Sequence, residues 1–406
     1  MVFFKKNKKL LIVLIIIIIF TGLFFRYLNR APKRNYCDFR VFYATAQRFA
    51  ACENIYARPD EKITPYKYSP IVAMMFSPLS VLSQKKAALV FFTINFIFLA
   101  LALIYSRKII TKDDPGSAWG NFGLYALSTV CCLRFILHAF DSGQVGVIIT
   151  FFVVFGLYFI QKKKEVIGSA FLSLGSLFKY TPFLFLPYFL LRKKIKVVIF
   201  VIVFVAVYFL LPALHVGIDN EVTYIKNWVP FITSTSFDHG SWYDNKNQSI
   251  YSVFLRYLTK DSPYKVRILN LSFNQGIALS FFVILVLYML IIVKKQNSDF
   301  ETCIDYSLLF VSMAFFNPNG WLHNYAACIF PYMALFYYLI KTAFKDKIVL
   351  LLVVLSFALT TLTSEMFVGD NLETVFEEFS VTAIGFFVLM LALFKVKFFE
   401  VVTHNK

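Results

Sequence analysis

Residues 197–213 read VVIFVIVFVAVYFLLPA, a run without a charged side chain that follows the basic cluster Arg192 to Lys196. An apolar run of this length, bounded by charge, is typical of a helix that crosses a lipid bilayer. The sequence therefore predicts an all-α, polytopic bundle of about twelve transmembrane helices. The predicted spans lie near 9–25, 86–106, 119–137, 144–160, 165–178, 181–191, 197–213, 273–293, 303–316, 323–340, 348–363 and 379–394.

The composition also calls for lipid as the solvent. Of the 406 residues, 59% are hydrophobic and only 16% are charged, which leaves too little polar surface for a water-soluble protein. The formal net charge of +18 comes from short basic clusters between apolar runs, which indicates cytoplasmic loops rather than a nucleic-acid-binding face. We therefore expect a multi-pass protein of the inner (plasma) membrane, with a cytoplasmic N-terminus and no nucleic-acid partner.

Two long polar stretches, 26–68 and 213–272, interrupt the apolar runs. With the N-terminus inside, both face outward, and neither contains a repeat or a linker to a soluble domain. We expect one membrane domain over 1–406, whose two external loops carry amphipathic helices. Residues 69–84 either dip into the membrane or lie at its outer surface. Residues 10–25 are a first anchor, which we favour, or the apolar core of a signal peptide.

A break is predicted between the segments 165–178 and 181–191, because each is shorter than the roughly 20 residues that an upright helix needs. The junction, Lys179 to Pro182, is expected in the outer half of the membrane. Irregular backbone is tolerated there only beside protein or a wet cavity. The Lys179 ammonium then either faces an outer cavity or snorkels to the lipid headgroups.

The first external stretch contains Asp38, about one helical turn before Phe42. A carboxylate at the membrane interface, partly dried by aromatic side chains, is suited to take a proton from a sugar hydroxyl. The alternative is structural, with Asp38 paired to Arg40 or capping a helix. Tyr68, at the end of the same stretch, is by itself only an interface anchor.

Four polar residues lie at the outer end of the span 119–137 and in the turn after it: Arg134, His138, Asp141 and Gln144. A buried guanidinium at that depth is usually paired or functional. Arg134 therefore either holds a lipid-linked phosphate or pairs internally with Asp141, and the residues alone do not separate these interpretations.

Two further polar groups are expected on the same outer side. Asn247 and Gln248 offer both donors and acceptors, which suit sugar hydroxyls but also turns and helix caps. Trp321 and His323 begin an inward turn, where tryptophan can stack on a sugar and histidine can donate to an oxygen. An interface tryptophan and a satisfied histidine are the default for an isolated pair. All these residues are expected on the same outer side of the membrane, and this common location is what favours a functional site.

The six cysteines show no CxxC or His-rich pattern, so we expect neither a metal site nor a redox site. Cys37 and Cys52 share the first external stretch. They either form a disulfide or remain free thiols.

The order of these pieces resembles glycosyltransferase family 87, membrane mannosyltransferases of the GT-C fold that use polyprenyl-phosphate sugars. The chain departs from the family pattern at Ser69, where proline is usual, and at Gly146, where an amide is usual. The resemblance covers about 35 to 335 and rests on the Asp38 helix, Tyr68-Ser69-Pro70, Gly143-Gln144, Gly168 through Lys179 to Pro182, Asn247-Gln248-Ser249, and Pro318 with Trp321 and His323.

The resemblance implies that Asp38 is a general base and that the donor is a polyprenyl-phosphate sugar. It also implies a glycolipid or glycan acceptor, inversion at the anomeric carbon, and no cofactor. Lys179, Arg134 and His323 would then stabilise the departing phosphate. A transporter or flippase of lipid-linked saccharides is the main alternative, but its paired discontinuous helices are not evident as an internal repeat. A transferase of whole glycans is a second alternative.

Overall fold

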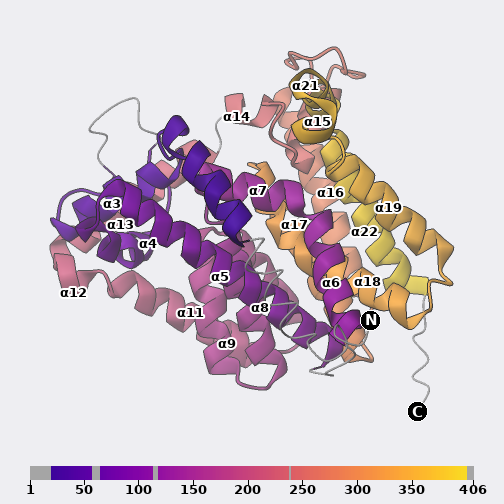
Figure 1. The fold of residues 1–406 in the computed structure, drawn as a ribbon, viewed down its shortest axis with the longest axis horizontal. Coiled ribbons are helices and arrows are strands. Elements are labelled where there is room, and N and C mark those ends of the chain that lie inside the picture. The colour runs from indigo at the N-terminus through magenta and orange to yellow at the C-terminus, as the bar shows by residue number, and fades with distance from the viewer. Residues whose placement is uncertain (1–19, 57–64, 113–117, 237–238, 400–406) are drawn as a thin grey trace.

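The computed structural model describes residues 20–56, 65–112, 118–236 and 239–399 (Figure 1). Within these ranges no strand forms, and Thr259 and Leu271 make an isolated bridge. The all-α class predicted from the sequence is therefore confirmed. Most of the first predicted span, 9–25, lies outside the described residues.

Residues 20–30 are helical, and the named elements follow in chain order. The first half contains η1 (Pro32–Arg34), α3 (Phe39–Ala50), α4 (Pro70–Phe76), η2 (Ser77–Val81), α5 (Gln84–Thr111), α6 (Ala118–Cys131), α7 (Leu133–Ser142), α8 (Gly146–Gln161), α9 (Glu165–Phe178), η3 (Thr181–Leu184), α10 (Phe185–Leu191) and α11 (Ile195–Leu210). The second half contains α12 (Ala213–Val216), α13 (Ile218–Ser236), α14 (His239–Tyr243), α15 (Ile250–Leu258), α16 (Phe273–Val293), α17 (Asp299–Phe315), η4 (Leu322–Cys328), α18 (Ile329–Lys341), α19 (Lys347–Thr360), α20 (Glu365–Val368), α21 (Asp370–Glu378) and α22 (Val381–Phe399).

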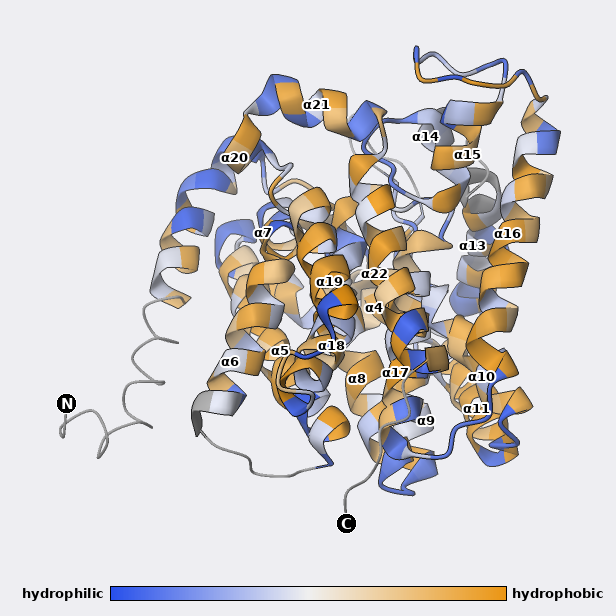
Figure 2. Ribbon diagram, turned by 90° about the vertical axis from the view of Figure 1, so that its right-hand side faces the viewer, coloured by the Kyte–Doolittle hydropathy of each residue, from blue (hydrophilic) through white to orange (hydrophobic). Residues whose placement is uncertain are grey.

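Hydrophobic residues fill the middle of the bundle, and hydrophilic residues collect at its two ends (Figure 2). Among the described residues, four helices are long and apolar enough to cross a membrane: α5, α11 with α12, α16 and α22. The bent pair α6–α7 brings the number to five. The predicted count of about twelve is not confirmed by this measure, because other apolar helices, α8, α9 and α19 among them, have only 10–17 residues.

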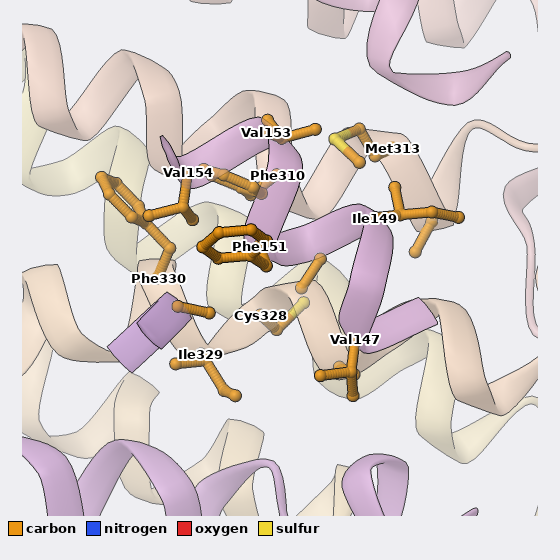
Figure 3. Packing of buried hydrophobic residues seen from close by; sticks show 14 of the residues in the cluster. Val147, Ile149, Phe151, Val153, Val154, Phe310, Met313, Cys328, Ile329 and Phe330 are labelled. Atoms are coloured by element: carbon orange, nitrogen blue, oxygen red, sulfur yellow. The ribbon is translucent and has the colours of Figure 1, made fainter. Parts of the chain in front are cut away.

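Helix α8 lies inside the bundle, with α5 and α9 packed on it. Its sequence, GVIITFFVVFGLYFIQ, has no charged face, and most of its side chains are buried. Figure 3 shows Val147, Ile149 and Phe151 of α8 close to side chains of α17 and of the segment around Ile329. A helix that is apolar all round needs cover on every side, and α5, α9 and η4 supply this cover for α8.

The structure agrees with one predicted break and adds another. Helix α9 ends at Phe178 and the next helical segment begins at Thr181, as the lengths of the apolar runs predict. The predicted span 119–137, however, is wrong as a single straight helix. It divides into α6 and α7, which meet at an angle of 65° around Cys132. No proline or glycine marks this bend in the sequence.

The two polar stretches that were predicted to be external, 26–68 and 213–272, carry the amphipathic helices that were predicted for them. Helix α3 buries Phe39, Phe42 and Phe49 on one face, and α15 buries Ile250 and Leu255. The cysteines of the first stretch are free thiols rather than a disulfide.

A buried ion-pair network lies at the end of the bundle predicted to be cytoplasmic. Asp305 of α17 is fully buried, Arg192 donates to its Oδ2 at 3.0 Å, and Lys397 pairs with its Oδ1. Buried charges need such partners. Part of the basic excess therefore joins α10, α17 and α22 instead of facing water.

Candidate functional site

A cavity of about 750 Å³ opens near the predicted outer end of the bundle and is lined in part by the polar stretch 26–68 and the 317–324 loop. Segments far apart in the sequence contribute to its walls, because α3, α7, α9 and the 317–324 loop meet there. Seven of the residues proposed from the sequence line this cavity: Asp38, Tyr68, His138, Gln144, Lys179, Trp321 and His323.

Asp38 stands at the N-terminal end of α3, where its side chain makes no capping hydrogen bond. Its backbone N–H donates to the carbonyl of Ser142 at 3.1 Å, which joins α3 to the turn between α7 and α8. Gly143 in that turn has a φ of +67°, and a Cβ there would lie 2.7 Å from the Cβ of Phe39. Only glycine suits this close approach in a left-handed conformation. The contact brings Asp38 next to Gln144.

A short hydrogen-bond chain orients the Asp38 carboxylate. The side-chain amide of Gln144 donates to Asp38 Oδ2 at 2.6 Å, and the Tyr68 hydroxyl donates to Gln144 Oε1 at 3.2 Å. Burial, followed by the nearby charge of Asp38, raises the pKa of Tyr68, so its hydroxyl remains a donor. The tyrosine thus sets the orientation of the glutamine amide, and the amide N–H faces the carboxylate.

Lys179 occupies the break between α9 and η3 with an extended backbone. Its ammonium donates to Asn324 Oδ1 at 2.6 Å, and the amide of Asn324 donates to the carbonyl of Asn319 at 2.9 Å. The side chain is therefore held inside the bundle at the cavity wall, which agrees with the cavity-facing alternative and not with snorkelling.

Two histidines and a tryptophan also belong to the polar part of the cavity lining. The imidazole rings of His138 and His323 are nearly parallel, with centroids 6.0 Å apart. His323 belongs to η4, and Trp321 is the N-cap residue of η4. Both side chains therefore depend on the conformation of the 317–324 loop. The structure places these rings on the same cavity as Asp38 and Lys179.

Asn247 and Gln248 do not line the cavity; they hold the 317–324 loop from behind. The Asn247 amide donates to the carbonyl of Pro318 at 2.7 Å, and its Oδ1 accepts from the N–H of Gly320 at 2.9 Å. A Cβ on Gly320 would lie 2.7 Å from the backbone nitrogen of Ser249, so glycine permits this contact. The Gln248 amide is bonded to backbone carbonyls of its own loop and of Glu377.

Arg134 and Asp141 do not pair with each other, and each is bonded to residues elsewhere in the chain. The Arg134 guanidinium donates to Glu373 Oε1 at 2.6 Å and to the carbonyl of Thr360 at 3.0 Å. Asp141 pairs with Arg26 at 2.5 Å and with Arg30 at 3.2 Å. The alternative of an Arg134–Asp141 pair is therefore wrong, and Arg134 is engaged away from the cavity.

Several cavity residues were missed by sequence reasoning. Trp228 of α13 carries no local signal, yet its indole N–H donates to the carbonyl of Lys67 at 3.2 Å, and its ring packs on Phe209. Lys67, by contrast, lies inside a stretch already singled out, between Tyr66 and Tyr68. The missed lining residues with polar side chains include Lys67, Tyr180, Trp228, Asn317 and Asn319.

The cavity lining combines two chemically different kinds of side chain. It contains a carboxylate, two ammonium groups and two imidazoles, and it also contains apolar side chains such as Phe183, Val205, Phe209 and Ile232. Such a site suits an amphipathic ligand with hydroxyl and anionic groups at one end and hydrocarbon at the other. Across the described residues, no group of three His, Cys, Asp or Glu side chains could hold a metal ion.

The chain matches the family model described as glycosyltransferase family 87 over residues 66–318, which is more than half of its length. The match includes Tyr68, Gln144 and Lys179 and excludes Asp38, Trp321 and His323. No curated protein and no solved structure matches the chain. Its apolar helices identify a membrane protein, and the family match identifies its class: the chain belongs to glycosyltransferase family 87.

Proposed function

We propose that this membrane glycosyltransferase transfers a hexose, mannose or a closely similar sugar, from a polyprenyl-phosphate donor to a glycolipid or glycan acceptor. The reaction takes place on the extracytoplasmic face of the plasma membrane and serves cell-envelope or glycolipid synthesis. The observation that carries the proposal is a cavity that combines an oriented carboxylate, Asp38, and a hydrogen-bonded ammonium, Lys179, with apolar lining residues. In this arrangement the carboxylate would meet the acceptor hydroxyl, the ammonium would meet the donor phosphate, and the apolar residues would meet the lipid chain.

In the proposed reaction, Asp38 accepts the proton of the acceptor hydroxyl while that oxygen attacks the anomeric carbon. The bond from the anomeric carbon to the phosphate oxygen breaks on the opposite face, so the configuration inverts. The electron pair leaves with the phosphate, and the products are the glycosylated acceptor and a polyprenyl phosphate. The donor phosphate is already a good leaving group, so catalysis consists mainly of positioning and charge stabilisation.

The residues around Asp38 would supply that positioning. Gln144 fixes one carboxylate oxygen by its hydrogen bond of 2.6 Å, which leaves the other oxygen to meet the acceptor. Lys179 and His323 share the cavity and would stabilise charge on the leaving phosphate. Trp321 offers a flat face on which the sugar can stack.

The first test is transfer from a panel of radiolabelled short-chain polyprenyl-phosphate hexoses by the purified protein in detergent. Asp38→Asn keeps the shape of the side chain but cannot take the proton, and we expect its transfer rate to fall on the order of 100-fold or more. Asp219→Asn changes an exposed carboxylate of α13 and serves as the matched control.

Each part of the proposal can fail separately. Full activity of Asp38→Asn would remove Asp38 as the base while leaving the donor class intact. Failure of the wild-type protein to consume any polyprenyl-phosphate sugar, with nucleotide sugars consumed instead, would overturn the donor class.

A further inference from the structure

Two lysines, and not one, line the cavity. Lys179 comes from the break after α9, and Lys67 comes from the segment that precedes α4. The Lys67 side chain is exposed, but its backbone carbonyl and the residue that follows it are held in place. Trp228 donates to the Lys67 carbonyl at 3.2 Å, and the next residue, Tyr68, donates to Gln144. The contact that orients Gln144 therefore also holds the residue next to Lys67 at the cavity.

The two ammonium groups lie near enough to affect one another. Both side chains border the same cavity, so each positive charge acts on the other. Like charges that share a partly buried cavity repel each other, and an anion bound between them removes the repulsion. The arrangement thus indicates an anion-binding position beside Lys179, on the side of Lys67.

The charged side chains of the cavity show how many cations the bound phosphate requires. Apart from the imidazoles, the charged side chains among the described residues of the cavity are Asp38, Lys67 and Lys179. With a phosphodiester donor, which carries one negative charge, the site is neutral. After transfer Asp38 holds the proton and the phosphate monoester carries up to two negative charges, so the site is neutral again. The negative charge moves from Asp38 to the phosphate, and a second cation is needed there.

We propose that Lys67 is a second phosphate-binding residue, which pairs with the negative charge that the phosphate gains as the sugar leaves. This inference rests on the proposed function, because it assumes that a lipid phosphate is the leaving group. Lys179 would bind the phosphate in donor and product alike. Lys67 would contribute mainly to the product-like state, in which the phosphate has become a dianion.

The experiment measures inhibition of the purified enzyme by a short-chain polyprenyl phosphate, the product monoester, at pH 5.5 and pH 7.5. Ionisation of the monoester, with a pKa of about 6, should make wild-type inhibition stronger at the higher pH. In Lys67→Met we expect inhibition to be weaker by roughly tenfold at pH 7.5 and nearly unchanged at pH 5.5. The KM for the donor should change much less, because the donor phosphate carries a single charge at both pH values.

Two variants make the result specific. Lys67→Arg keeps the positive charge and should retain most of the pH dependence. Lys85→Met removes an exposed lysine at the start of α5, outside the cavity. The product should inhibit this variant as it inhibits the wild type. If Lys67→Met keeps the wild-type pH dependence, or if Lys85→Met loses it equally, the assignment of Lys67 is overturned although transfer from the donor continues. Absence of wild-type transfer would instead overturn the proposed function.

Discussion

Two clusters of buried or half-buried polar side chains near the predicted outer end of the bundle differ in whether their polar groups face open space. The first, here called the cavity cluster, lines open space. The second, the closed cluster, joins α7 to the C-terminal helices and does not line that cavity. The cavity cluster consists of Asp38, Tyr68, Gln144, Lys179 and His323, and the closed cluster consists of Arg134, Thr360, Glu373, Glu377 and Thr382.

The comparison shows that a buried charge does not by itself identify a site. The Arg134 guanidinium has a carboxylate, a hydroxyl and a carbonyl as partners from α19, α21 and α22. Asp38, in contrast, is bonded through one oxygen by Gln144 and borders a cavity large enough for a sugar phosphate. Space beside the charge, rather than burial, is what separates a candidate for chemistry from a structural ion pair.

The largest effect that we expect outside the cavity cluster is on folding, in Arg134→Met. The change leaves Glu373 and Glu377 close together without the cation they share, and breaking a buried pair from one side costs about 3–5 kcal/mol. We expect a marked loss of folded protein and a lower Tm in detergent. Thermal unfolding followed by size-exclusion chromatography, together with the rate per folded molecule, measures both quantities.

Two further outcomes separate structure from function at Arg134. Adding Glu373→Gln to Arg134→Met removes one orphaned carboxylate, so it should recover part of the lost stability. A variant Arg134→Met with native stability but no transfer would break the distinction between the two clusters, because it would place Arg134 in the reaction.

An intermediate effect is expected from Gln144→Met within the cavity cluster. The variant loses the amide that holds Asp38 Oδ2 at 2.6 Å, while methionine fills a similar volume. We expect kcat to fall roughly tenfold to a hundredfold with little change in the donor KM and in the Tm. Tyr68→Phe removes only the outer link of the chain and should have a smaller effect on kcat. Equal losses in kcat and in Tm would show that Gln144 supports the fold rather than Asp38.

Local features of the fold could be predicted from the sequence because apolar runs and their interruptions are local signals. The segments 165–178 and 181–191 correspond to helical segments with the same bounds. The bend at Cys132 could not be predicted, since its neighbours are apolar and no proline or glycine marks it. The predicted number of about twelve crossings exceeds the four or five that helix length supports. The reason is that short buried helices resemble membrane spans when only apolar runs are counted.

The candidate site was partly predictable for a related reason. Topology brings Asp38, Gln144, Lys179 and His323 to one side of the bundle, and the structure places them on one cavity. For Arg134, the partner Glu373 lies 239 residues further along the chain, and no spacing rule connects them. Long-range partners of this kind decide whether a polar residue is free to act, and a single sequence does not contain them.

The smallest effect concerns Glu221, a carboxylate of α13 that belongs to neither cluster. Its side chain is 1% exposed, and neither oxygen has a hydrogen-bond partner among the described residues. Burial raises the pKa of Glu221 to about 7, so the folded state favours the protonated form. Its contribution to stability is complete below the ordinary glutamate pKa and is lost as the pH rises through 7.

Glu221→Gln should therefore raise the Tm by roughly 1–2 °C at pH 8 and leave it nearly unchanged at pH 5, where wild-type Glu221 is already neutral. Thermal unfolding at the two pH values measures the difference, with Glu365→Gln, an exposed carboxylate of α20, as the control. Sugar transfer at pH 7 should stay close to that of the wild type, because Glu221 does not line the cavity. An equal shift at both pH values would mean that packing, and not charge, distinguishes the variant. A loss of transfer without a shift would mean that an unpartnered buried carboxylate can serve the site from outside the cavity cluster, which the comparison of the two clusters does not allow.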